Sequence, residues 1–431
     1  MKKKIIILIL LTVLTTLYFY LYSVFTYDSV WNYGFAYNIV HGLVPYKDYN
    51  MIITPLFPYL LSILILFFGH KLILYYIFIS ILIVLTSYIC YKKIGYKSIA
   101  VFFLLLAIHE LGYNVLALFL FMSLLYLLDN DDANDLLIAI IIGLMILTKQ
   151  TLGLLIIPSI IYSKNKKKTI ITYIIVFLIF LCYLIINNSL LQFVDYCFFG
   201  MFDFTSNNGT KFTLVTLGEI IICFSLVLAL IKSKLKNKEL FYILLFQIIV
   251  FPIVDGVHFI ITFIPILYYI FYRLNYKYIN YLIYMTILSF TVVYNLLQID
   301  YSLDTLNSNK NSFMYKRRIQ NYLNDYFIYI RESQKKYKES RIYFLDSRAY
   351  LVKLELNTKI NKYDLINYGN MGYHGDERYI REIDNYCDKH SCVFFISGDK
   401  EIKQMNKRII DYVKKNYNQE ASSSLENIYK N

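Results

Sequence analysis

The stretch YDSVWNYGFAYNIVHGLVPYKDYNMIITPLFPYLLSILILFFG, Tyr27–Gly69, decides the architecture of this chain. Its first half predicts a short helix over about Ser29–His41, which Gly42 ends. Apolar residues recur on one face of that helix at i, i+4 and i+8: Trp31, Phe35 and Ile39. A helix with such a face can lie flat on a membrane surface.

The second half of the same stretch predicts another short helix, Leu56–Phe68. Thr54 is placed to cap it, Pro55 takes its first position, and Gly69 ends it. About thirteen residues of helix reach only ~20 Å, which is too short to cross ~30 Å of hydrocarbon comfortably. We therefore expect a re-entrant or interfacial helix, inside a long first outer loop over about residues 26–70.

Apolar blocks dominate the chain on both sides of this loop. The 431 residues are 58% hydrophobic and 17% charged, whereas soluble domains average roughly 45–50% and 25%. The pattern predicts a polytopic α-helical membrane protein with about eleven spans. The predicted spans are 5–25, 71–91, 98–112, 113–128, 135–148, 151–163, 169–188, 212–231, 239–254, 259–272 and 279–298.

Basic residues set the orientation. Sixteen fall in the loops that lie inside if the N-terminus is cytoplasmic: Lys2, Lys3, Lys4, Lys92, Lys93, Lys97, Lys164, Lys166, Lys167, Lys168, Lys232, Lys234, Lys236, Lys238, Arg273 and Lys277. Four fall outside: Lys47, Lys71, Lys149 and Lys211. This bias predicts a plasma-membrane protein with its N-terminus in the cytoplasm. It also explains the net charge of +13 without a nucleic-acid partner.

The composition changes at about residue 299. We expect residues 1–298 to form the transmembrane part and 299–431 a small extracytoplasmic α/β domain. Within it, Asn321–Glu339 predicts a helix, and Arg341–Leu345 and Cys392–Ile396 predict strands. The Gly-rich segment Asn367–Glu377 predicts a loop. Cys387 and Cys392 form a disulfide or remain two thiols, and the sequence favours neither.

Charged and polar side chains gather on the predicted outer side. Polar groups at membrane depth are expensive, so they are functional candidates by default. The set comprises Asp28, Asp48, His109, Glu110, Lys149, Gln150, Asp195, Asp203, Asp255 and His258.

At these residues the sequence resembles the C-type (GT-C) membrane glycosyltransferases, which include protein O-mannosyltransferases and the aminoarabinose transferases of lipid A. The first-loop pattern falls in order on Asp28, Gly42, Pro45, Tyr46, Asp48 and Pro55. LTKQTLG (Leu147–Gly153) looks like the family's lysine loop, and DGVHFIITFIP (Asp255–Pro265) like a late His motif. Two positions depart from the pattern: Ser29 replaces a second acid, and Thr54 replaces a lysine.

The resemblance implies inverting sugar transfer from a polyprenyl-phosphate donor to an extracytoplasmic glycan, lipid or protein acceptor. An acceptor hydroxyl must lose a proton as it attacks, so Asp28 is the candidate base. A cation stabilises the leaving phosphate, and Lys149 is suitably placed. The remaining substrate-binding candidates are Asp48, Glu110, Asp255 and His258. No cofactor is indicated with certainty, and a divalent metal is an open alternative.

Four of these candidates also have a simpler structural explanation. Asp28 could only cap the first short helix, and Asp48 could be a solvated turn residue. Lys149 could snorkel to the interface, and His258 could be a bonded interface histidine. The competing functions are a lipid-linked polysaccharide polymerase, a flippase or transporter, and a non-catalytic scaffold.

Overall fold

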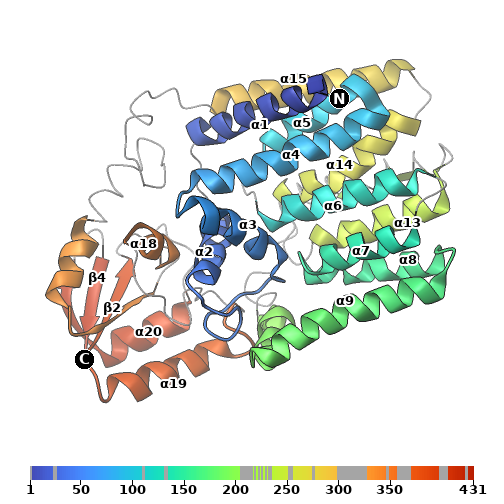
Figure 1. Cartoon of the computed structure of the whole chain (residues 1–431). Helices are drawn as coiled ribbons and strands as arrows, with labels where there is room; N and C mark the ends of the chain where they lie inside the picture. The colour runs from blue at the N-terminus through green and yellow to red at the C-terminus, as the bar shows by residue number, and fades with distance from the viewer. Residues whose placement is uncertain are drawn as a thin grey trace.

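The computed structural model describes most of the chain (Figure 1). The described residues are 2–22, 27–108, 112–130, 134–203, isolated positions within 217–231, 235–250, 256–273, 277–298, 328–345, 349–356, 370–397, 406–422 and 426–431. The side chains of Leu21, Tyr22, Tyr27 and Asp28 are not among what is described.

Helices make up most of the described part of residues 1–298. They are α1 (Lys2–Tyr22), α2 (Tyr27–Val40), α3 (Leu56–Phe68), α4 (Ile73–Ile94), α5 (Ser98–Leu106), α6 (Tyr113–Leu128), α7 (Asp135–Ile146), η2 (Gln150–Leu155), α8 (Ile156–Ile161), α9 (Lys166–Ile186), α10 (Leu190–Val194), η3 (Asp195–Phe199), α13 (Asn237–Phe246), η4 (Gln247–Val250), α14 (Gly256–Arg273) and α15 (Lys277–Gln298).

These helices match the predicted apolar blocks, and the protein is a polytopic helical membrane protein. Four described stretches are long and apolar enough to cross a membrane: Lys2–Tyr20, Ile73–Leu106, Lys166–Ile186 and Gly256–Arg273. Most predicted spans have a helix in the same place, but several of these helices are shorter than a full crossing. The predicted span 212–231 lies largely outside the described residues.

Contacts between predicted inner loops show that these loops share one end of the helical part. The Lys93 ammonium lies 5.6 Å from the Tyr272 ring centroid, and the Lys97 ammonium 5.5 Å from that of Phe271. Arg273 lies 3.9 Å from Asp129 and 3.8 Å from Glu239. The N-terminus is at this same end, away from the strands, in Figure 1.

Helix α2 differs from its prediction in position and surroundings. It begins two residues early, so Asp28 lies within its first turn rather than before it. It packs between α3 and α18 (Ala349–Leu356), and most of its described residues are buried. Helix α2 is therefore largely enclosed by protein, while its orientation flat on the membrane stays a prediction. Helix α18 of the C-terminal part contributes to this burial.

Helix α3 has the predicted length, and Gly69 ends it with φ +82° and an N–H bond to the Ile65 carbonyl. Thr54 does not cap this helix, because its hydroxyl donates to the carbonyl of Ile146 instead. Pro55 is the residue before the helix rather than its first residue. One face of α3 is buried, while Leu66, Phe67 and Phe68 are exposed apolar residues, as expected at a lipid interface.

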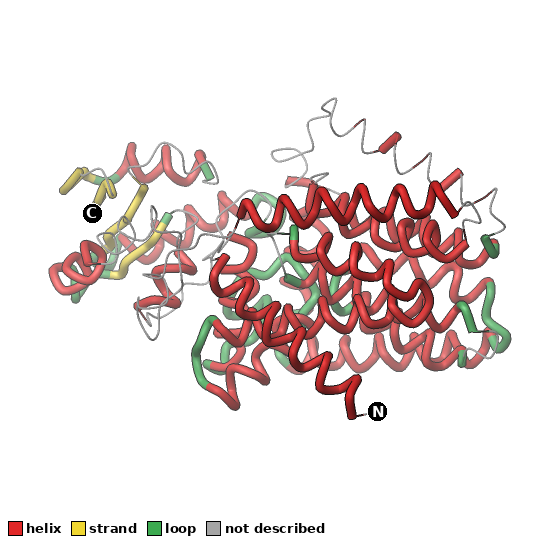
Figure 2. The backbone as a smooth tube through the Cα atoms, turned by 90° about the horizontal axis from the view of Figure 1, so that it is seen from above, coloured by secondary structure: helices red, strands yellow, loops and turns green. Residues whose placement is uncertain are grey.

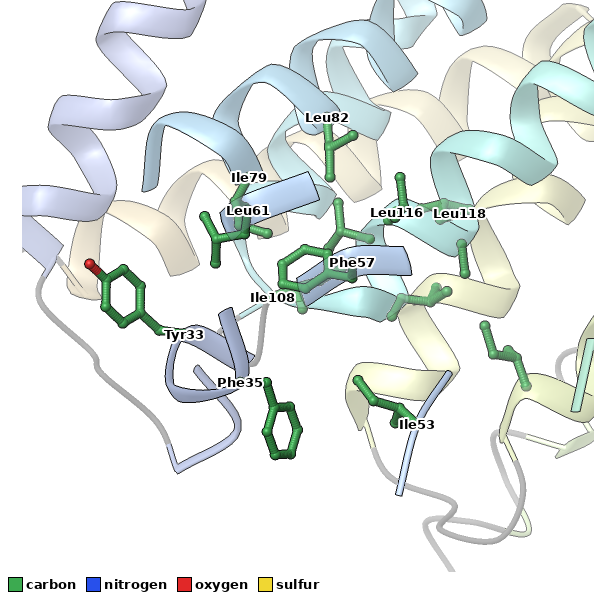
Figure 3. Close-up of a cluster of buried hydrophobic side chains, with 14 of the residues drawn as sticks. Tyr33, Phe35, Ile53, Phe57, Leu61, Ile79, Leu82, Ile108, Leu116 and Leu118 are labelled. Atoms are coloured by element: carbon green, nitrogen blue, oxygen red, sulfur yellow. The ribbon is translucent and has the colours of Figure 1, made fainter. Parts of the chain in front are cut away.

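Buried apolar side chains join the first loop to the helices. In Figure 3, Tyr33 and Phe35 of α2, Phe57 and Leu61 of α3, and Ile79 and Leu82 of α4 lie in one cluster. All six side chains are essentially inaccessible to solvent. Because the cluster continues to Leu116 and Leu118 of α6, the first loop is fixed to the helical core.

The C-terminal part carries a small mixed sheet, which lies apart from the helices of residues 1–298 in Figure 2. The strand order is β1 (Arg341–Phe344), β2 (Cys392–Ser397), β4 (Glu426–Lys430), β3 (Asn418–Ser422). β1 and β2 are parallel, and β4 is antiparallel to both β2 and β3. Helices α18, α19 (Gly375–Cys387) and α20 (Lys407–Asn416) accompany the strands. The two predicted strands are confirmed, whereas the polar β3–β4 hairpin was not predicted.

Cys387 and Cys392 form a disulfide between the end of α19 and the start of β2. The open question left by the sequence is thus answered in favour of pairing. Disulfides persist in oxidising compartments.

A hydrogen bond from His70 of the first loop joins that loop to the C-terminal part. Its Nε2 lies 3.1 Å from the Leu354 carbonyl of α18, and its Nδ1 lies 2.9 Å from the Tyr33 hydroxyl. Since a carbonyl only accepts, Nε2 carries the proton, and Nδ1 of the neutral ring accepts from Tyr33. Burial lowers the pKa of His70 below its ordinary value of 6.5.

We expect acid to weaken this contact. The unfolded chain binds a proton at His70 below about pH 6.5, whereas the folded protein resists it, so stability is full above that pH and falls below it. The thermal unfolding midpoint should drop more between pH 7.5 and 5.5 in wild type than in His70→Gln, which donates to Leu354 without titrating. If the midpoint falls equally in both proteins, protonation of His70 does not weaken this contact.

Candidate active site

Three hydrogen bonds join the first loop to the segment between α7 and η2. The Thr54 hydroxyl donates to the Ile146 carbonyl at 2.8 Å, and the Leu56 N–H to the Leu147 carbonyl at 2.8 Å. The Gln150 side-chain amide donates to the Ile52 carbonyl at 3.0 Å. These bonds satisfy non-helical backbone and align the first loop with the predicted lysine loop. We call this three-bond contact the first-loop zipper.

Lys149 lies within this contact and is 7% exposed. Its Nζ donates to the Ile249 carbonyl of η4 at 2.7 Å and lies 5.7 Å from the Tyr113 ring centroid. The side chain is therefore directed into protein rather than snorkelling to the interface. A lysine amine held between a carbonyl and an aromatic face is a candidate contact for an anionic substrate group.

Gln150 couples the same segment to η3. Its Nε2 donates both to Ile52 and, at 3.1 Å, to the Cys197 carbonyl. Among the described residues no donor reaches its buried Oε1. Buried acceptors are normally satisfied by protein, water or a ligand, so Gln150 Oε1 is a candidate substrate contact.

Asn114 and His258 form a second polar group close by. Asn114 Nδ2 lies 3.4 Å from His258 Nε2, which joins the first turns of α6 and α14. Asn114 is 5% exposed, and within the described part of the chain its Oδ1 has no hydrogen-bond partner. On α2, Asn32 packs against Gly112, where an added Cβ would lie 2.7 Å from Asn32 Nδ2.

The candidate base is located by its helix only. Asp28 occupies the second position of α2, four residues before Asn32, so the two positions lie on one helix face. Because Asn32 reaches Gly112, that face is directed toward the start of α6. The side chain of Asp28 lies outside what the structure describes, as do Glu110 and Asp255 entirely.

Asp48 has a structural partner. Its Oδ2 accepts from the Val44 N–H at 2.7 Å, and its own N–H donates to the Val44 carbonyl at 3.0 Å. The same turn holds Tyr46 at φ +69° with its hydroxyl bonded to Ile53. Asp48 therefore shapes the turn, in agreement with the structural explanation, and its role in substrate binding stays a prediction.

No group of three His, Cys, Asp or Glu side chains suited to a metal comes together within the described ranges. The side chains of Asp28, Glu110 and Asp255 lie outside those ranges. The divalent metal thus stays an untested alternative.

The site also contains residues that sequence reasoning did not single out. Asn32 and Asn114 were missed, although each is an amide placed in or beside an apolar helix, which is the pattern that marked the acids. Tyr113 was missed because aromatic residues are abundant throughout this chain. Their partners come from distant segments that the sequence does not bring together.

The comparisons bear on the fold. No protein-family model matches the chain, and no curated protein matches it in sequence. The crystal structure of ArnT from Cupriavidus metallidurans in the apo state has a similar structure, with a TM-score of 0.56 and 9% identity. The similarity covers 98% of this chain and 97% of that chain. The two chains therefore share a fold over nearly their whole length.

Gln150→Glu should destabilise the folded protein. The change is nearly isosteric, but it sets a carboxylate oxygen against the carbonyls of Ile52 and Cys197 in place of a donor. We expect a loss of about 1–3 kcal/mol, seen as a lower unfolding midpoint in the same lipid. Gln150→Met, which removes the bonds without adding charge, is the control and should lose less. An unchanged midpoint in Gln150→Glu would contradict the first-loop zipper.

Proposed function

We propose that this chain is a membrane glycosyltransferase that moves a sugar from a polyprenyl-phosphate donor to an extracytoplasmic glycan, lipid or protein acceptor. The observation that carries the proposal is the buried Lys149 ammonium, held where the first loop, α6 and η4 meet. The fold shared with ArnT supports the same class of reaction.

The proposed reaction is a single inverting displacement. The acceptor oxygen attacks the anomeric carbon, its proton passes to Asp28, and the bond from that carbon to the phosphate oxygen breaks. The electron pair leaves with the polyprenyl phosphate, whose growing negative charge Lys149 stabilises. Proton removal by a positioned carboxylate contributes typically 10²–10⁴-fold.

The location of the polar groups favours this reaction over transport. Asn114, His258 and Lys149 all lie at helix ends, on the side of the helical part that faces the C-terminal strands. A transporter typically has its substrate groups near the membrane midplane, at broken helices. A polysaccharide polymerase or a flippase is the alternative if no sugar is transferred.

An exposed apolar surface on α9 is a candidate path for a lipid donor. Residues along α9 line it: Ile175, Leu178, Ile179, Cys182, Tyr183, Ile186 and Asn187. At its end, the Tyr183 hydroxyl lies 2.6 Å from that of Tyr59 on α3. We propose that the polyprenyl chain follows this surface toward the first loop.

The proposal includes the membrane arrangement: about eleven spans, a transmembrane part over 1–298, and an extracytoplasmic domain over 299–431. The N-terminus is then cytoplasmic and the C-terminal domain outside. The Cys387–Cys392 disulfide supports an outer location, because cytoplasmic thiols are kept reduced.

Asp28→Asn should abolish transfer while leaving the fold intact. The amide keeps the shape of the side chain but cannot accept the proton, so we expect a loss of roughly 10²–10⁴-fold in kcat. The assay offers labelled polyprenyl-phosphate sugars and candidate acceptors to protein in lipid vesicles. Donor consumption that the variant retains would remove Asp28 from the mechanism. No consumption by folded wild type, with any donor, would favour polymer assembly or transport.

Lys149→Met should also reduce transfer, by about 10²–10³-fold, because it removes the cation that stabilises the leaving phosphate. Lys71→Met is the matched control, since Lys71 is an exposed lysine of the same predicted outer side. If both variants lose activity equally, or neither does, a specific role of Lys149 is wrong.

A further inference from the structure

The C-terminal part donates hydrogen bonds to both carboxylate oxygens of Asp195, a residue of the helical part. Arg378 Nη2 of α19 donates to Asp195 Oδ2 at 2.5 Å, and the Tyr373 N–H donates to Asp195 Oδ1 at 3.0 Å. The next N–H, of His374, donates to Asp203 Oδ2 at 2.6 Å. Charge-assisted bonds of this kind are stronger than neutral ones.

The Gly-rich loop that precedes α19 is shaped around the Asp195 carboxylate. Arg378 also donates to the carbonyls of Met371 at 3.0 Å and Tyr373 at 3.3 Å, so one guanidinium holds the loop and Asp195 together. Gly372 has φ +86°, and a Cβ there would lie 2.2 Å from Asp195 Oδ2. Asn50 of the first loop donates to the Asn370 carbonyl at 3.0 Å. The predicted Gly-rich loop is therefore an inter-part contact rather than a bare turn.

A short path leads from Asp195 to Lys149. Asp195 opens η3, a single turn of π-helix, and such turns often occur at functional sites. Two residues on, the Cys197 carbonyl accepts from Gln150, which also bonds Ile52 of the first loop. Gln150 directly follows Lys149, whose ammonium is fixed on its other side by Ile249. A shift of Asp195 therefore moves one of the two carbonyls that hold Gln150.

We propose that Arg378 is a positioning residue for sugar transfer. Through Asp195, η3 and Gln150 it holds Lys149 in line with the leaving phosphate of the donor. This inference rests on the proposed function for its chemistry and on the contacts above for the coupling. Arg378 is 41% exposed at its side chain and Asp195 17%, so removing the guanidinium leaves a largely buried carboxylate without this cation.

The test measures hydrogen exchange in the full chain in lipid nanodiscs. In Arg378→Ala we expect faster amide exchange in 371–378, in 195–200 and also in 147–155. Arg381→Ala is the matched control, because Arg381 lies on the same helix and donates to the Glu377 carbonyl; it should leave 195–200 and 147–155 unchanged. Arg378→Lys keeps the charge but not the fork of donors, so it should lie between wild type and Arg378→Ala.

Kinetics give the second measurement. A displacement of a reacting group by about 1 Å can cost on the order of 10²-fold in rate. We expect kcat to fall about tenfold or more in Arg378→Ala, with Arg378→Lys partly restoring it. The KM for donor should change less than twofold, because the Lys149 charge remains.

Each outcome decides the proposal. Faster exchange limited to 371–378, or a rise in KM without a fall in kcat, would mean that Arg378 only docks the loop, and the proposal would be overturned. If wild type transfers no sugar but exchange still spreads to 147–155, the coupling stands and the proposed function is what fails. If Arg378→Ala does not fold, the comparison of Arg378→Lys with wild type decides the coupling.

Discussion

The first-loop zipper, the hydrogen bonding between Ile52–Leu56 and Ile146–Gln150, is the constraint on which the rest of the structure depends. Buried backbone outside a helix must find hydrogen-bond partners within the protein. Here the first loop and the α7–η2 segment satisfy each other. The same contact fixes the backbone position of Lys149. It also places the first loop, which carries Asp28, beside the segment that carries Lys149.

The C-terminal part extends this constraint. His70 and Asn50 of the first loop bond to Leu354 and Asn370, while Asp195 is held by Arg378. Helix α18 covers α2, so the helix that carries the candidate base is enclosed by protein from both parts. The C-terminal part thus contacts the first loop and η3, two segments that adjoin the proposed active site.

Local pattern predicted much of this arrangement. Apolar block length placed the helices, the basic loops gathered at one end, and Gly69 ended α3. The predictions that failed concern residues whose partners lie far away in the sequence. The burial of α2 could not be read from Trp31 and Phe35, because α18 is far away in sequence. Thr54 bonds to Ile146 rather than to its own helix, and the strand NQEAS (Asn418–Ser422) has no apolar alternation to predict it. Arg378 and Asp195 are 183 residues apart, so no local pattern could pair them.

In the proposed mechanism, Lys149 binds the donor phosphate where the first loop, α6 and η4 meet. The most direct measurement is a structure of the protein in lipid nanodiscs with a polyprenyl phosphate bound. We expect a phosphate oxygen within hydrogen-bonding distance of Lys149 Nζ, and the isoprenoid chain along α9 toward α3. A phosphate bound at the opposite end, near Lys93 and Arg273, or midway along the helices, would contradict the proposed function.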